Sequence, residues 1–270
     1  MPDQKAPSCK LVQILGETVH PGEHVTLDLQ VARLYTRTTV EIPVLNVFGF
    51  LAMQRQLPDG RDLNRFFPGS PRGSLASRLA HALVTEVLPA VDVVIDMHSG
   101  AARRHNHPHL RYTEGDENSL ALAEVFDPPL IMKAPIRHKS LREHLVSLGR
   151  TYLLFEGGKA GSLDEDAIRE AHRGITRVMH HLGLWDGTPD TERGAVRVAA
   201  SKWVRAPHAG LFHPLVENGS HVQEGMVLGS VTDPYGELTH QVRAAFGGYV
   251  LCVNTSPVVN QGDALFHVAF

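Results

Sequence analysis

Arginine, asparagine and aspartate are crowded into one short polar run at residues 59–69, which reads DGRDLNRFFPG. Arginine presents a planar fork of N–H donors that matches a carboxylate, and asparagine adds a donor and an acceptor. Glycine and proline bound the run, which favours a loop. These are the residue types that a pocket for a small carboxylate requires.

A second candidate group lies at the end of an apolar run. Residues 91–97 are nearly all apolar, which is typical of a strand buried in a parallel sheet, and Asp96 and His98 stand at its end. Side chains alternate along a strand, so these two point the same way. An imidazole oriented by a neighbouring carboxylate suits a zinc ligand. The alternative is a histidine that only forms hydrogen bonds in the core.

Glu156 follows another apolar run, residues 151–155, and precedes two glycines that let backbone approach a ligand. A partly desolvated carboxylate there could take a proton from a metal-bound water. The alternative is a carboxylate without a catalytic role. Ligands of open α/β sheets bind at the carboxyl ends of the strands, so Glu156 and His98 both stand where a site is expected.

The elements that must position these residues alternate between strands and helices. Residues 11–44 are β-rich, and an apolar stretch continues through residue 50. Helices are predicted at 74–88, 117–126, 140–148 and 164–182, and extended segments at 91–97, 128–134 and 151–155. The histidine-rich residues 105–109 are predicted to lie in a polar, solvated loop. The alternation predicts an α/β fold with right-handed connections.

After a polar segment at residues 186–197, the sequence changes to short predicted strands separated by turns. We interpret this segment as a linker between an α/β domain, 1–185, and a β-rich module, 198–270. Within the module, residues 205–211 are echoed by 243–249, and 222–228 by 259–265. Such a repeat predicts two β half-units that bury their apolar faces together. The pattern resembles the small biotinyl/lipoyl β-sandwich. The turn at 233–237 has no lysine, which argues against a swinging-arm carrier.

Composition points to a soluble, cytoplasmic protein. The formal net charge of −3 and the pI near 6.6 give no reason to expect binding to nucleic acid or an anionic membrane. No stretch approaches the roughly 20 apolar residues of a membrane span. The two cysteines are far apart in the sequence and are expected to be reduced.

The polar run 59–69 and the strand that ends at His98 together resemble the succinylglutamate desuccinylase/aspartoacylase family. These are zinc hydrolases with a carboxypeptidase-like mixed sheet flanked by helices. The resemblance implies a homo-oligomer that removes an acyl group from a small N-acylated amino acid.

The resemblance also assigns roles to individual residues. Asn64 and Arg65 match the pair that binds the substrate carboxylate, and Arg55 matches an arginine that polarises the scissile carbonyl. Glu156 matches the general base, and His98 matches one of three zinc ligands. The alternatives are a turn network for Asn64 and Arg65, and a solvated surface arginine for Arg55.

This sequence departs from the family where two zinc ligands are expected. Members carry a histidine and a glutamate in a His-Gly-x-Glu run between their Ile-Pro-Val and Asn-x-x-Gly-Phe stretches. Here residues 42–44 run directly into 45–50, so a unit of about 30 residues is missing. His20 and Glu23 have the required spacing, although they also read as a Pro-Gly turn between strands. The tract 105–109 is a further, adventitious metal candidate.

The missing ligands leave three functions open. The first is the zinc-dependent deacylase, with weak or no activity in this chain. The second is a catalytically impaired protein that binds small carboxylates through Arg65. The third is an oligomeric assembly protein that uses its β-rich module as an interaction surface. Succinyl-glutamate, acetyl-aspartate and acetyl-diaminobutyrate would all offer a carboxylate to Arg65.

Overall fold

The computed structural model describes residues 31–34, 37–101 and 103–270. Contacts divide the chain into two compact units. The first comprises Met1–Asp92 with Arg137–Arg150, and the second comprises Val93–Ile136 with Thr151–Phe270. The predicted domain limits at residues 185 and 198 were based on the change in sequence pattern and not on these contacts, and they stay a prediction.

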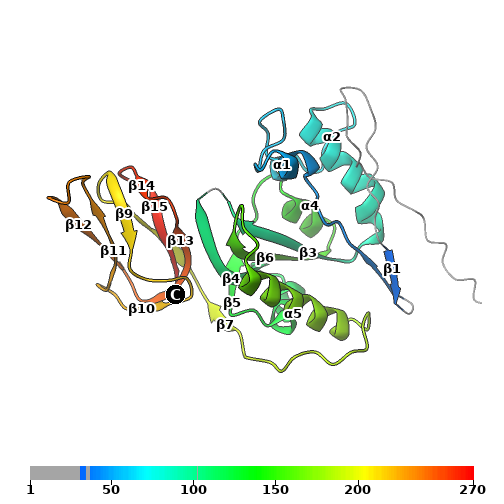
Figure 1. The fold of residues 1–270 in the computed structure, drawn as a ribbon. Helices are drawn as coiled ribbons and strands as arrows, with labels where there is room; N and C mark the ends of the chain where they lie inside the picture. The colour runs from blue at the N-terminus through cyan, green and yellow to red at the C-terminus, as the bar shows by residue number, and fades with distance from the viewer. Residues whose placement is uncertain (1–30, 35–36, 102) are drawn as a thin grey trace, which may run out of the picture. The chain divides into compact units, whose positions relative to one another are not determined.

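Helices dominate the described part of the first unit (Figure 1). Its elements are β1 (Val31–Leu34), β2 (Arg37–Val40), α1 (Val47–Leu51), η1 (Leu63–Arg65), α2 (Leu75–Ala82), η2 (Leu83–Val87), η3 (Leu88–Ala90) and α4 (Leu141–Ser147). The predicted helix 74–88 is confirmed, and Ser74 caps it by accepting a hydrogen bond from the Ser77 N–H. Residues 47–51 do not extend the preceding apolar run, because Asn46 accepts from the Gly49 N–H and starts a helix.

A nine-stranded mixed sheet organises the second unit. Its first part contains β3 (Val93–Gly100), β4 (Arg104–Thr113), β5 (Leu130–Ala134) and β6 (Thr151–Lys159). β3 and β6 are parallel, whereas β4 runs antiparallel to β6 and parallel to β5. The helices α3 (Glu117–Phe126) and α5 (Glu165–His181) match the predicted spans 117–126 and 164–182.

One face of this sheet is apolar and the other carries polar groups. Leu153 and Phe155 of β6 pack with Phe126 of α3 and Val178 of α5 in one buried cluster, and α5 lies across the sheet in Figure 1. Residues alternate between faces along a strand, so Glu156 lies on the face opposite to these helices. The sheet therefore separates a packed core from a polar surface.

The histidine-rich residues 105–109 do not form the predicted solvated loop. They belong to β4, which pairs with β6 on one edge and with β5 and β13 (Gly248–Asn254) on the other. His109 and Leu110 are buried. Pro108 has no N–H to donate, and it sits where the register between β4 and β6 shifts. Backbone hydrogen bonds to the neighbouring strands determine the conformation of residues 105–109, although their polar side chains favour a loop.

The sheet continues into the C-terminal residues. β13 pairs with β4 and with β15 (Ala264–Ala269), which pairs with β8 (Ser201–Arg205). A separate four-stranded sheet contains β9 (Gly210–Pro214), β11 (Val227–Thr232), β12 (Thr239–Arg243) and β14 (Val258–Val259). Two further short strands are β7 (Val196–Val198) and β10 (His221–Val222).

The internal repeat places its matching residues in one core. Val222 and Val259 are equivalent in the two copies, as are Leu228 and Leu265, and all four lie in the same buried cluster. The shared cluster explains why the same apolar positions recur. The likeness to a biotinyl/lipoyl module stays a prediction.

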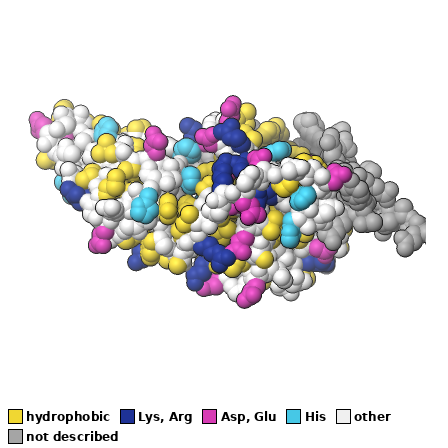
Figure 2. Space-filling view, turned by 90° about the horizontal axis from the view of Figure 1, so that it is seen from below, with side chains coloured by type: hydrophobic (Ala, Val, Ile, Leu, Met, Phe, Trp, Pro, Cys, Tyr) yellow, Lys and Arg dark blue, Asp and Glu magenta, His cyan; other side chains and the backbone are white. Residues whose placement is uncertain are grey.

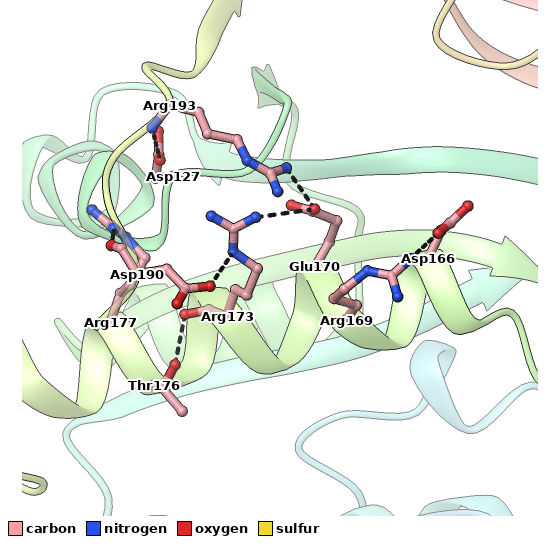
Figure 3. Close-up of polar contacts among 9 residues, drawn as sticks. All are labelled: Asp127, Asp166, Arg169, Glu170, Arg173, Thr176, Arg177, Asp190 and Arg193. Atoms are coloured by element: carbon pink, nitrogen blue, oxygen red, sulfur yellow. Dashed lines mark hydrogen bonds and ion pairs between the residues drawn. The ribbon is translucent and has the colours of Figure 1, made fainter. Parts of the chain in front are cut away.

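The polar segment 186–197 makes extensive contacts. Asp190 accepts from the Arg173 Nε at 3.0 Å, and Glu192 pairs with Arg177 at 2.9 Å (Figure 3). The N–H of Arg193 donates to Asp127 at 2.7 Å. The segment is thus attached to α5 along its length. No helix of the described residues is long and apolar enough to cross a membrane.

Candidate functional site

His98 and Glu156 stand opposite each other on the parallel strands β3 and β6. Neighbouring strands are about 4.8 Å apart, so the two residues are adjacent on the polar face of the sheet. Both are partly buried. The structure therefore brings together the imidazole that the sequence analysis predicted as a zinc ligand and the carboxylate that it predicted as the general base.

A short hydrogen-bonded chain orients His98. The Tyr152 hydroxyl donates to Asp96 Oδ2 at 2.6 Å, and Asp96 Oδ1 lies 3.2 Å from His98 Nε2. Asp96 and His98 share a face, as strand alternation predicts. A carboxylate on one ring nitrogen selects the tautomer and holds the imidazole in place. On the imidazole, Nε2 makes this contact.

Asn106 positions the carboxylate of Glu156. Its Nδ2 donates to Glu156 Oε2 at 2.9 Å across the β4–β6 pair. The sequence analysis missed this residue, because Asn106 is 50 positions from Glu156 and was expected in a loop. A bond from an amide to a carboxylate fixes one oxygen and leaves the other for chemistry.

The arginines of the polar loop share one carboxylate in the first unit. Asp62 Oδ2 accepts from Arg55 Nε at 3.0 Å and lies 3.9 Å from Arg65 Nη1. Both arginines are more than a third exposed, so the pairs contribute little to stability. An anion with better geometry than Asp62 could compete for either guanidinium.

Asn64 has a structural role in the described residues. Its Oδ1 accepts from the Leu141 N–H at 2.8 Å, which ties the loop to the first turn of α4. Its backbone carbonyl accepts from Arg65 Nη1 at 2.5 Å. Arg55, Asn64 and Arg65 therefore lie in one loop of the first unit, whereas His98 and Glu156 lie in the second.

The described residues do not form a zinc site. They contain no group of three or more His, Cys, Asp and Glu side chains that could hold a metal ion. His98 lies 3.2 Å from the carboxylate of Asp96 on its own strand. His20 and Glu23, the predicted replacement ligands, lie outside the described residues. Two histidines and a glutamate around an open position are not present in this part of the chain.

Two histidines of β4, His105 and His109, are likewise engaged in protein contacts, and His105 Nε2 lies 2.9 Å from Asp164. His109 Nδ1 lies 2.7 Å from the His107 carbonyl oxygen, so this nitrogen donates, and Nε2 accepts from Arg111 Nε at 3.1 Å. Burial first, and then the charge of Arg111, lower the pKa of His109 well below its usual value. His109 is a neutral residue of the core.

The environment of Cys252 does not favour a nucleophilic thiolate. It is buried on β13, and burial raises the pKa of its thiol to about 12. The thiolate is therefore not populated at neutral pH.

The family model described as succinylglutamate desuccinylase/aspartoacylase catalytic domain matches residues 23–182. The chain belongs to this family. The resemblance drawn from the polar loop and the His98 strand is thus confirmed, and so are the mixed α/β fold and membership in a family of deacylating hydrolases.

Individual relatives agree with this assignment. The N-alpha-acetyl-L-2,4-diaminobutyric acid deacetylase of Halomonas elongata is 29% identical over 242 residues, which span 84% of this chain and 71% of the relative. A succinylglutamate desuccinylase/aspartoacylase structure from Rhodobacter sphaeroides superposes with a TM-score of 0.76 at 28% identity, over 86% of this chain and 75% of that one. The ectoine utilization protein EutE (DoeB) of Ruegeria pomeroyi shares the fold, with a TM-score of 0.79 at 23% identity over 87% and 75% of the two chains.

Proposed function

We propose that this protein hydrolyses the amide bond of a small N-acylated amino acid, with Glu156 as the general base. The contact that carries the proposal is the bond from Asn106 to Glu156, which holds the carboxylate beside His98 at the end of β6. A positioned carboxylate that takes a proton from water contributes about 10²–10⁴-fold to a hydrolysis.

Arg65 and Arg55 are the proposed anion-binding groups. Arg65 would bind the substrate carboxylate in competition with Asp62, and Arg55 would stabilise negative charge on the carbonyl oxygen. Asn64 would support Arg65 through its backbone carbonyl, since its side-chain oxygen already holds α4.

N-acetyl-2,4-diaminobutyrate is the first substrate to test. The proposal rests on the 29% identical Halomonas elongata relative, whose name states this activity. The substrate carries a carboxylate for Arg65 and a secondary amide for hydrolysis.

The family resemblance implies zinc, but the described residues do not fit it, and no step is assigned to a metal here. Zinc dependence would require His20 and Glu23 to join His98. A second candidate function, binding of small carboxylates without hydrolysis, is favoured by the lack of three clustered metal ligands in the described residues.

The test combines elemental analysis with a hydrolysis assay on the full chain. We expect diaminobutyrate release to fall by about 10²–10⁴-fold in Glu156→Gln. The matched control is Glu165→Gln, which makes the same change at an exposed glutamate of α5 and should retain activity. Zinc bound in one equivalent and lost in both His98→Ala and His20→Ala would support a metal site.

Absence of product release with and without added zinc would contradict the hydrolase. Retention of carboxylate binding in that case, with its loss in Arg65→Ala, would support the binding function. The expected homo-oligomer is a separate proposal, which the native mass of the protein tests.

A further inference from the structure

A row of paired residues crosses the sheet of the second unit, from the strand beside the proposed base to β8. Its members are Asn106 (β4), Cys252 (β13), His267 (β15) and Trp203 (β8). Residues directly opposite each other on paired strands point to the same face of a sheet. The row therefore continues the polar face on which Asn106 donates to Glu156.

Arg104 lies over the last residue of this row. Its guanidinium carbon is 4.9 Å from the centroid of the Trp203 ring, and that ring is stacked on His267 with centroids 4.4 Å apart. Arg104 is exposed, and Trp203 is partly buried. Cation–π attraction holds a guanidinium over an aromatic ring while its N–H groups stay able to donate. The stack thus holds a positive group at the surface of the polar face.

The charge of Arg104 is not paired within the part of the chain that the structure describes. Among these residues, no carboxylate lies within ion-pair distance of Arg104, and its side chain makes no hydrogen bond to them. Arg173 and Arg193, by contrast, both pair with Glu170 (Figure 3). Figure 2 likewise shows side chains of both signs intermixed on the face that it views. Arg104 is therefore an exposed cation that an anion from solution can reach.

Arg104 and Glu156 are near enough to act on one small ligand. β13 and β15 lie between β4 and β8, so an arginine that starts on β4 and reaches Trp203 places its guanidinium over these two strands. With neighbouring strands about 4.8 Å apart, the guanidinium lies roughly 5–10 Å from β4. Burial is the main cause of the raised pKa of the Cys252 thiol, which the charge of Arg104 lowers and that of Glu156 raises. Both charges therefore act on the same residue of the row.

We propose that Arg104 is a specificity-determining residue that binds a second carboxylate of the substrate, beyond the one assigned to Arg65. This inference rests on the proposed function and narrows its substrate class to N-acylated amino acids with two carboxylates. Guanidinium and carboxylate form charge-assisted hydrogen bonds, frequently as a parallel pair. A carboxylate a few carbon atoms from the scissile amide spans the separation between Glu156 and Arg104. It belongs either to the amino acid or to the acyl group, and the experiment distinguishes these sources.

The experiment uses Trp203 as a reporter. The chain has two tryptophans, so the full-length Trp185→Phe variant emits from Trp203 alone. Its fluorescence is read immediately after mixing with N-acetylglycine, which has one carboxylate, N-acetyl-L-glutamate, with a second on the amino acid, or N-succinylglycine, with a second on the acyl group. We expect saturable binding of at least one dicarboxylate that is about 10- to 100-fold tighter than that of N-acetylglycine. The tighter dicarboxylate identifies the source of the second carboxylate.

Arg104→Gln and Arg103→Gln form the matched pair of variants in this background. Arg103 is the preceding residue, is also exposed, and donates to Ser256 Oγ at 3.0 Å. Arg104→Gln should bring dicarboxylate binding to within about threefold of N-acetylglycine, whereas Arg103→Gln should keep the preference. Arg104→Lys keeps the charge without the planar fork and should retain only part of the preference. Circular dichroism checks that each variant is folded.

Three results would overturn the proposal. The first is equal binding of all three compounds. The second is a dicarboxylate preference that survives Arg104→Gln, which would place the second carboxylate elsewhere. The third is a preference lost equally in Arg103→Gln, which would show a general effect of net charge.

The fluorescence titration does not depend on turnover, so it separates this proposal from the proposed function. An Arg104-dependent preference in a protein that hydrolyses none of the three compounds would support the carboxylate subsite and contradict the hydrolase. Hydrolysis without such a preference would contradict the subsite alone.

Discussion

The polar loop at 59–69 is rich in charged residues and the strand β4 is rich in histidines, and the two segments differ in where the partners of their polar side chains lie. In the loop, Arg61 pairs with Asp59, two positions away, and Asp62 pairs with Arg55, seven positions away. In β4, His105 pairs with Asp164, 59 positions away, and Asn106 with Glu156, 50 positions away.

The difference has an energetic consequence. Exposed ion pairs between near neighbours are screened by water and contribute about 0–1 kcal/mol. The strand β4 pairs with three neighbouring strands, β13, β5 and β6, and contains buried residues. Loss of packing in β4 should therefore destabilise the sheet. Substitutions in the loop should therefore change stability little, whereas truncation of a buried residue in β4 should lower it.

The largest effect is expected for Leu110→Ala in β4. Leu110 is fully buried in the cluster shared with α3 and α5, so its truncation should lower the free energy of unfolding by about 2–5 kcal/mol. Urea denaturation followed by circular dichroism measures this change. A loss below about 1 kcal/mol would contradict a central position for β4.

Acidification should lower the free energy of unfolding through a buried histidine. Burial is the main cause that lowers the pKa of His267, on β15, from 6.5 to about 4. Between these pH values the unfolded chain binds a proton that the folded protein does not, so stability falls as the pH drops from about 6.5 toward 4.

The variant His267→Phe should keep the ring stacked on Trp203 without titrating. We expect the loss of unfolding free energy between about pH 7 and pH 4 to be smaller in this variant by on the order of 3 kcal/mol. Denaturation curves at several pH values measure this difference. Parallel pH profiles for the two proteins would show that His267 titrates normally.

Asn106→Leu tests the link from β4 to chemistry. Removal of the bond to Glu156 should lower kcat by about 10- to 100-fold, as expected for a hydrogen bond to a charged group, with little change in KM. Steady-state kinetics separates the two constants. A larger change in KM than in kcat would mean that Asn106 supports substrate binding or structure instead of positioning the base.

The smallest effect is expected in the loop. Arg61→Ala breaks an exposed pair with Asp59, and the free energy of unfolding should change by no more than about 0.5 kcal/mol. The same urea denaturation measures this change, so the values for Arg61→Ala and Leu110→Ala can be compared directly. A cost above about 1 kcal/mol would show that the loop network is more than local.

Elements with local signals could be predicted well from the sequence. The helix at 117–126 has Asp116 as its cap, and α5 has Asp164 in the same role. Such caps act within one turn of the helix, so a short window of sequence contains them. The position of His98 at the end of an apolar run followed from the same kind of local pattern.

Elements that depend on distant partners could not be predicted. β4 reads as a loop because its side chains are polar, and its strand conformation comes from β6, β5 and β13, which lie far along the chain. The helix α1 is a different case: its cap, Asn46, is a local signal, but the apolar residues on both sides of it made the segment resemble one continuous strand.

By itself the sequence determined the family, the α/β class, most helices and the residues of chemical interest, because residue type and short-range spacing carry these signals. Only the tertiary structure decided that Asn106 holds Glu156 and that Asp62 lies between two arginines. Hydrogen bonds between distant residues and the desolvation of a side chain depend on which segments pack together, and a local pattern does not contain that information.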